Sequence, residues 1–261
     1  MNKLLIGSTL LSSFLFAGGH VAPLVQDVAP ILIVEETSAW ELEFSPYLAM
    51  SSISGDSAVV LAKDNPLDVG FDDILDALEF GVAGHFEAMH NSGWGLELDY
   101  NYVSLGGSAN IPGTARSLTL DVKQSVFEAM GIYRQNLENG SIDYMAGIRR
   151  WRLKMDAEIS GLPNLRNTNN DWVDGIVGAR WINNINETWK FYVSGDIGAG
   201  GADFTASAVA GFRYTLNEWL DLDIQYKGLW VDYETGTANT LNYFKYDTVT
   251  YGPMLGLNFK F

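Results

Sequence analysis

TVTYGPMLGLNFKF, residues Thr248 to Phe261, closes the chain and alternates apolar residues with small or polar ones. The side chains of a β-strand point alternately to its two faces, so one face of this segment is apolar along its whole length. That face carries Tyr251, Pro253, Leu255, Leu257, Phe259 and Phe261. A soluble sandwich rarely ends on an exposed Phe-Lys-Phe, whereas a strand of a membrane barrel turns its apolar face to lipid. The segment therefore predicts the last strand of a transmembrane β-barrel.

The composition supports a large β-domain and excludes several functions. The chain has 261 residues, 13% aromatic residues, 27 glycines and a mean hydropathy of +0.02. No cysteine is present, so a disulfide, a thiol nucleophile and a thiolate metal site are excluded. A formal net charge of −16 argues against nucleic acid as a partner, because phosphate binding needs clustered Lys and Arg. No cofactor is expected.

The N-terminus carries a targeting signal ahead of the barrel. Residues 1–19, MNKLLIGSTLLSSFLFAGG, place Lys3 before an apolar run and small residues after it, which predicts a secretory signal peptide. Residues 20–39 contain two prolines and mixed polar residues, and we interpret them as a periplasmic lead-in. Residues 40–261 form the predicted barrel.

From Trp40 onward the alternation predicts about ten antiparallel strands, with eight or twelve as alternatives. They cover residues 40–50, 79–90, 94–105, 117–134, 141–156, 172–182, 189–197, 204–215, 220–227 and 248–261. Short turns follow the even-numbered strands and mostly longer loops follow the odd ones, as in outer-membrane barrels with short periplasmic turns. Between Val122 and Phe127 the apolar residues change from one face of the strand to the other, and this parity slip predicts a β-bulge. Tryptophans near the strand ends predict interfacial girdles at Trp40, Trp94, Trp172, Trp189, Trp219 and Trp230.

Three segments resemble a widespread, functionally uncharacterised family of proteobacterial outer-membrane barrels, a group of small porin-like proteins. They are PLDVGFDDILDALEFGVAGHFEAMHNSGWGLELDYNYVSL (66–105), DWVDGIVGARWINNINETWKFYVSGDIGAGG (171–201) and YDTVTYGPMLGLNFKF at the end. The resemblance covers most of the chain from Trp40 and implies a monomeric barrel in the outer membrane, but no established activity. It also implies contact with lipid and lipopolysaccharide, and delivery by periplasmic chaperones and the barrel-assembly machinery. The assembly signal would be Tyr251, Leu255, Leu257, Phe259 and Phe261. The sequence departs from the family at Arg150, where an aromatic is more usual, so this arginine must lie near the rim.

The longest predicted external loop, residues 54–78, contains a short amphipathic helix. Asp72 and Asp73 suit a helix start, and apolar residues fall on one face. The helix either packs on the rim or plugs the mouth; the plug residues would be Phe71, Asp72, Asp73, Ile74, Leu75, Asp76 and Leu78. A divalent-cation site at the three aspartates is a weaker alternative, because the loop lacks EF-hand spacing.

The inward face of the predicted strands carries many charged side chains. The predicted lumen network comprises Glu41, Glu43, His85, Glu87, Glu97, Asp99, Arg149, Asp174, Arg180, Lys190, Asp196, Arg213, Asp221, Asp223, Lys227 and Lys260. A ten-stranded barrel is narrow, so these groups form either a filled polar core or an acid-biased conduit for small solutes.

The predicted function is structural or that of a restricted small-solute channel. Surface binding through the external loops at 54–78, 106–116, 159–171 and 233–247 is the alternative. Catalysis is not expected: His85 lies beside Glu87 and Glu97 on the inward face, and no nucleophile, oxyanion site or metal site accompanies it. A surface hydrolase is the least favoured reading.

Overall fold

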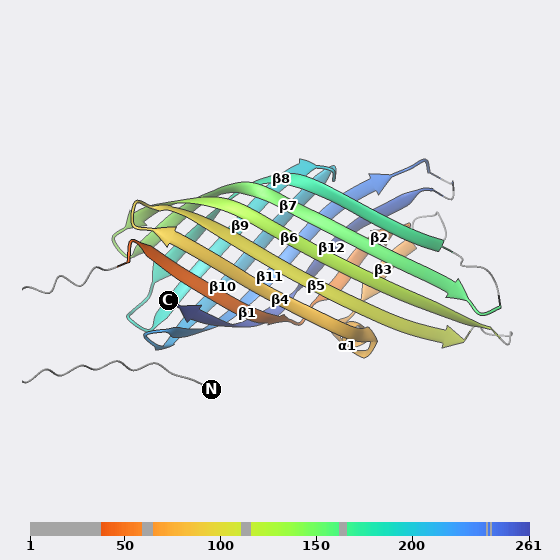
Figure 1. Ribbon diagram of the computed structural model, residues 1–261, viewed down its shortest axis with the longest axis horizontal. Helices are drawn as coiled ribbons and strands as arrows, with labels where there is room; N and C mark the ends of the chain where they lie inside the picture. Colours follow the sequence, from red (N-terminus) through yellow and green to blue (C-terminus); the bar gives the residue numbers. More distant parts are fainter. Residues whose placement is uncertain (1–37, 59–64, 111–115, 162–165, 239, 241) are drawn as a thin grey trace, which may run out of the picture. The chain divides into compact units, whose positions relative to one another are not determined.

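The computed structural model describes residues 38–58, 65–110, 116–161, 166–238, 240 and 242–261, and these form a closed antiparallel β-barrel of ten strands (Figure 1). The strands of the barrel are β1 (Trp40–Ala49), β4 (Leu78–His90), β5 (Trp94–Asn110), β6 (Ser117–Leu137), β7 (Gly140–Ile159), β8 (Arg166–Asn184), β9 (Trp189–Gly200), β10 (Phe204–Asn217), β11 (Leu220–Thr235) and β12 (Phe244–Lys260). β1 pairs with both β4 and β12, which closes the ring. The predicted signal peptide and nearly all of the predicted lead-in lie outside the described residues.

The first strand is longer than predicted and carries an extra hairpin. β2 (Ser52–Ser57) continues β1 and pairs with β12 in the same register, since Ala49 lies opposite Met254 and Ser52 lies opposite Tyr251. β2 then pairs with β3 (Asn65–Val69). The predicted loop 54–78 is therefore partly a β-hairpin, which the short polar sequence of these strands did not reveal.

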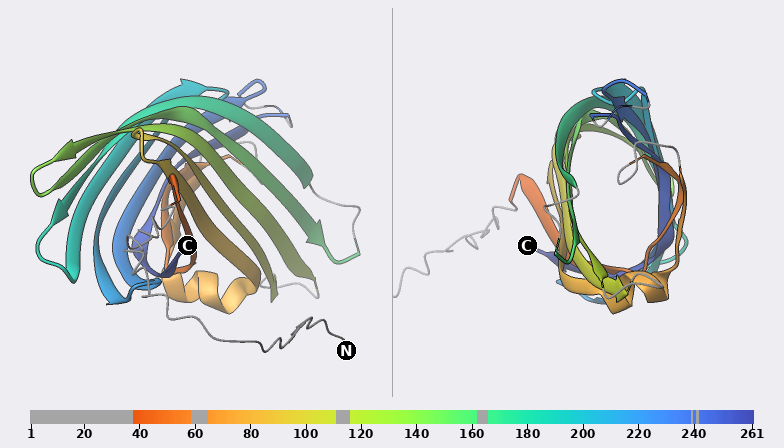
Figure 2. Two further views of the ribbon diagram at one scale, coloured as in Figure 1. Left: turned by 60° about the vertical axis from the view of Figure 1, so that its left-hand side comes forward. Right: turned by 90° about the vertical axis from the view of Figure 1, so that its right-hand side faces the viewer.

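The predicted helix exists as α1 (Phe71–Ala77), between β3 and β4. The Gly70 amide donates a hydrogen bond to Oδ2 of Asp73 at 3.1 Å, which satisfies one free N–H at the helix start. α1 contacts β5, and Figure 2 shows it in line with the barrel wall. Since β3 and β5 are not paired with each other, the helix occupies the break in the wall between them.

The alternation of side chains is confirmed along the strands. On β12, Leu255 and Leu257 face outward and are exposed, whereas Met254 and Asn258 face inward and are buried. Five of the predicted girdle tryptophans, Trp40, Trp94, Trp189, Trp219 and Trp230, are exposed on the outside. No helix among the described residues is long and apolar enough to cross a membrane.

Three predictions about the strands are wrong. β6 pairs with β5 and β7 in a continuous register, so no bulge lies between Val122 and Phe127. The parity slip arises because Val122 and Val126 face an apolar interior instead of lipid. Trp172 is likewise buried inside and is not part of a girdle. The predicted external loops are also shorter, since β5 runs to Asn110, β8 begins at Arg166 and β12 begins at Phe244.

Candidate functional site: the lumen

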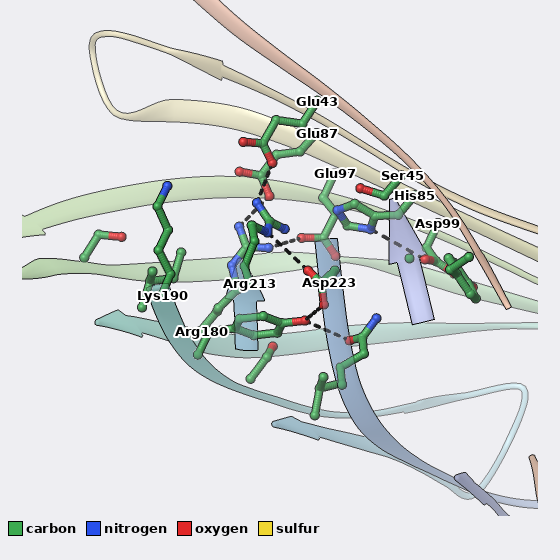
Figure 3. Close-up of a pocket in the computed structure, with 18 of the residues that line it drawn as sticks. Glu43, Ser45, His85, Glu87, Glu97, Asp99, Arg180, Lys190, Arg213 and Asp223 are labelled. Carbon is green, nitrogen blue, oxygen red and sulfur yellow. Dashed lines mark hydrogen bonds and ion pairs between the residues drawn. The ribbon is translucent and has the colours of Figure 1, made fainter. Parts of the chain in front are cut away.

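A pocket of about 310 Å³ occupies the half of the lumen next to the short turns. Asn136, Gly140 and Asn184 at these turns line its mouth, and charged side chains from most of the strands line its walls. Figure 3 shows two guanidinium groups in its centre, surrounded by carboxylates from opposite walls. The pocket therefore opens toward the end of the barrel that carries the chain's C-terminus.

Arg180 is the centre of the first ionic cluster. Its guanidinium donates to Glu87 at 2.6 Å, to Glu97 at 3.2 Å and to Asp143 at 2.9 Å. Arg134 donates to the same Asp143 at 2.7 Å and to Glu87 at 3.0 Å. Because β8, which carries Arg180, and β4, which carries Glu87, are separated by three strands, this cluster ties distant parts of the wall together.

Arg213 forms a second cluster from β10. It donates to Glu43 of β1 at 2.7 Å and to Asp223 of β11 at 3.1 Å. The hydroxyl of Tyr192 also donates to Asp223, at 2.6 Å. Planar guanidinium groups suit such multiple carboxylate contacts better than lysine would.

Arg149 forms a third cluster deeper in the lumen and is fully buried. It donates to Glu128 at 2.9 Å, to Asp196 at 3.0 Å and to the hydroxyl of Thr205 at 3.0 Å. Lys227 lies 3.8 Å from Glu128. A buried guanidinium needs such partners, because an uncompensated charge away from water is very unfavourable.

His85 lies where the sequence predicted, between acidic residues. Its Nδ1 is 3.5 Å from Asp99, which also accepts a hydrogen bond of 2.9 Å from Tyr47. Ligand atoms of His85, Glu87 and Glu97 lie within 4.8 Å of one another, a spacing that could hold a metal ion. Arg180 already contacts both glutamates, however, so the arginine occupies the position of a cation.

The pocket narrows toward the opposite end of the barrel. It continues into a cavity of about 30 Å³ that shares Tyr47, Asp99, Glu128 and Lys227 with it and also touches Val126 and Leu229. Those two apolar residues belong to a buried cluster that we call the aromatic layer: Val126, Trp151, Leu153, Trp172, Ala202, Leu229, Val231, Phe244 and Tyr246.

The aromatic layer joins the wall formed by β6–β8 to the wall formed by β11 and β12. Trp172 stacks on Tyr233 of β11 with ring centroids 3.9 Å apart, and Trp151 stacks on Trp172 at 5.7 Å. Tyr246 of β12 meets Trp151 edge-on and donates to Gln124 of β6 at 3.2 Å. Trp151 has no exposed surface. Packed rings thus lie in the lumen above the polar pocket.

The structure places the sixteen predicted network residues as follows. The pocket is lined by Glu41, Glu43, His85, Glu87, Glu97, Asp99, Arg180, Lys190, Arg213, Asp223 and Lys227. Arg149 and Asp196 pair with each other, Asp221 pairs with Lys260, and Asp174 accepts a hydrogen bond from the Ala202 amide. Among the described residues, Lys190 has no ion-pair or hydrogen-bond partner, and in Figure 3 it stands apart from the dashed network.

The sequence prediction missed Arg134, Asp143 and the aromatic layer. Arg134 and Asp143 lie directly opposite each other on β6 and β7, next to the short turn. Every second residue of β6 shares a face, so the inward Glu128 would place Arg134 inward as well. The residues between them on that face, Met130 and Ile132, have the apolar chemistry of lipid-facing residues. Both are buried inside, in a second apolar cluster.

The predicted plug residues, Phe71–Asp76 and Leu78, do not line the pocket. Leu75 and Leu78 are exposed. Plugging would require the helix to leave its place in the wall.

No family model and no curated protein matches the chain. Among solved structures, it is similar to the outer membrane protease OmpT from Escherichia coli, with a TM-score of 0.53 and 13% identity over 87% of this chain and 99% of that one. It is also similar to the translocator domain of the autotransporter NalP from Neisseria meningitidis, with a TM-score of 0.49 and 10% identity over 87% of this chain and 90% of that one. At such low identity the likeness to OmpT shows the fold alone. That fold is the closed antiparallel β-barrel of a bacterial outer-membrane protein.

Proposed function

We propose that this protein is a structural outer-membrane barrel whose lumen does not conduct. The aromatic layer carries the proposal, because it joins opposite walls with stacked rings, and only a cavity of about 30 Å³ lies between this layer and the polar pocket. The ionic clusters add to the closure, since their arginines are fixed by two or three carboxylates each. The polar pocket is then a blind cup open toward the periplasm. Membership of the uncharacterised proteobacterial family, a monomeric state and the absence of catalysis are parts of the same proposal.

A restricted channel is the alternative that the lumen itself suggests. It requires Trp151 and Trp172 to move, because a solute that crosses the pocket meets their packed rings. The acid-rich lining would then favour cations.

Surface binding is favoured by a different observation. β6 and β7 are 21 and 20 residues long, although a membrane strand needs about 9–11. On β7, the outward residues change from apolar at Ile148 to charged from Arg150 toward the external end. The strands therefore extend above the apolar belt and present a rigid charged surface outside it.

Cysteine labelling tests the blind-cup proposal directly, because the chain has no cysteine of its own. Ser194 lines the pocket below the aromatic layer, and Asn170 lies on the inward face of β8, beyond Trp172 toward the external end. In intact cells, a small charged thiol reagent should label Asn170→Cys and leave Ser194→Cys unlabelled. Permeabilised cells, in which the reagent reaches the periplasmic end, should label both. Rapid labelling of Ser194→Cys in intact cells would show an open lumen.

The C-terminal assembly signal gives a separate prediction. Phe261 is 78% exposed and its amide donates to the Leu42 carbonyl at 2.9 Å, at the end of the barrel that carries the short turns. If the barrel-assembly machinery recognises this ring, Phe261→Ala should lower the amount of folded protein in the outer membrane severalfold. Its refolding into lipid vesicles should stay unchanged. Phe212→Ala, which also removes an exposed outward ring, is the control. Equal losses for both variants in cells would contradict a specific signal. The measurement is the heat-shifted gel mobility of membrane fractions.

A further inference from the structure

A group of cations lies on the outer surface of the barrel, directly above its apolar belt. The chain has 16 Lys and Arg residues in all, and four of them form what we call the basic patch: Lys123, Arg150, Arg152 and Lys154. They come from the neighbouring strands β6 and β7 and are exposed. A protein with a net charge of −16 thus places a quarter of its cations on one outward surface.

The position of the basic patch matches the level of lipid head groups. Below it, the outward residues are apolar: Phe127 and Ala129 on β6, Ile148 and Ala146 on β7, Val173 and Val177 on β8. Above that belt, Phe127 lies opposite Arg150, Ser125 opposite Arg152 and Lys123 opposite Lys154. Basic residues at the edge of a membrane-spanning region meet the phosphates of the head groups.

The patch has an arrangement that calls for an anion. Lys123 and Lys154 are directly opposite across the two strands, and like charges in that position are destabilising unless they are compensated. Arg150 and Arg152 share Asp171 at 2.7 and 3.1 Å, and Lys154 contacts Asp156 at 3.1 Å. Among the described residues, Lys123 has no hydrogen-bond or ion-pair partner. Asp121 of β6 lies opposite Asp156 on the same surface, so four cations face three carboxylates.

The same residues line a groove of about 330 Å³ on the barrel surface. Its walls carry Tyr102, Lys123, Ser125, Arg152, Lys154, Asn169 and Asp171. Successive outward residues of a strand are about 6–7 Å apart and opposed ones about 5 Å, so three cations can reach one phosphate group. Ser125 and Asn169 add neutral hydrogen-bond donors, and the guanidinium of Arg152 suits bidentate contacts to phosphate oxygens.

We propose that this groove binds a phosphorylated glycolipid head group of the outer leaflet, the lipid A part of lipopolysaccharide. The acyl chains would lie on the apolar residues below the groove, and a sugar phosphate would sit between Lys123, Arg152 and Lys154. The site is independent of whether the lumen conducts, since it lies on the opposite face of the wall.

Binding of purified lipid A to the refolded protein (residues 20–261) in detergent, followed by native mass spectrometry, tests the proposal. The triple variant Lys123→Gln/Arg152→Gln/Lys154→Gln should bind bis-phosphorylated lipid A at least about tenfold more weakly. The single variant Arg152→Gln should bind severalfold more weakly. Arg116→Gln, which removes one charge at the external end of β6 outside the groove, should bind as the unchanged protein does. Heat-shifted mobility confirms that each variant is folded.

Two further arms identify the source of the phosphate. Dephosphorylated lipid A should bind the unchanged protein and the triple variant equally weakly. Inorganic phosphate should displace lipid A only at concentrations far above that of the lipid. The proposal is overturned if the folded triple variant binds lipid A normally, if Arg116→Gln weakens binding as much as Arg152→Gln, or if inorganic phosphate competes at concentrations similar to the lipid.

Discussion

Replacing Arg149 by alanine should lower the free energy of unfolding of the barrel by about 3–5 kcal/mol. The guanidinium is fully buried and bonded to Glu128 and Asp196, so its loss leaves two buried carboxylates without their main partner. Lys227, 3.8 Å from Glu128, and the Ser207 hydroxyl, which donates to Asp196 at 2.5 Å, offset part of that loss. Urea unfolding of the protein refolded in lipid vesicles, followed by tryptophan fluorescence, measures the change.

The next residue in the chain supplies the control. Arg150 faces outward, is 48% exposed and pairs with Asp171. Ion pairs at such exposed positions contribute about 0–1 kcal/mol, so Arg150→Ala should have little effect on unfolding. The double variant Arg149→Met/Asp196→Asn should recover part of the lost stability, because Asp196 is then neutral and Glu128 keeps Lys227 as its partner at 3.8 Å. Equal destabilisation by Arg149→Ala and Arg150→Ala would contradict a charged core at this position.

The double variant Trp151→Ala/Trp172→Ala should make the barrel permeable to small solutes. These rings form the middle of the stack that joins β7 and β8 to β11, and both are buried in the lumen. Their removal connects the 310 Å³ pocket with the external half of the interior. Swelling of vesicles in small sugars measures the permeability, which should rise from the level of protein-free vesicles.

The matched control removes two tryptophans from the lipid-facing surface. Trp94 and Trp219 are 62% and 55% exposed, so Trp94→Ala/Trp219→Ala should leave the vesicles impermeable. Large-to-small changes in a core cost about 3–5 kcal/mol each, so heat-shifted mobility must show that the lumen variant is folded. A folded Trp151→Ala/Trp172→Ala barrel that stays impermeable would mean that the closure lies elsewhere.

The outward residues of this barrel could be predicted from the sequence, because side chains that face lipid are apolar. Along β12 every outward residue from Tyr251 to Phe259 is apolar, and this alternation predicted both the strand and its faces. The charged lumen followed from the same parity, which is why Glu87, Arg180 and Arg213 could be placed inward before their partners were known.

The apolar residues of the interior could not be predicted in the same way. A lipid-facing residue and a residue of the aromatic layer have the same side-chain chemistry, and only the register of neighbouring strands separates them. Trp172 therefore resembled a girdle residue, and Val122 and Val126 produced a false bulge. The β2–β3 hairpin was missed because Ser52–Ser57 contains glycine and serines and follows no apolar alternation.

Single-channel recording of the unchanged protein in a planar bilayer tests the closed lumen most directly. The folded Trp151→Ala/Trp172→Ala variant, recorded in the same bilayers, shows whether an opened barrel gives detectable current. The closed lumen predicts no current steps from the unchanged protein and regular steps from the variant. Regular steps from the unchanged protein would contradict the closed lumen and identify a channel instead.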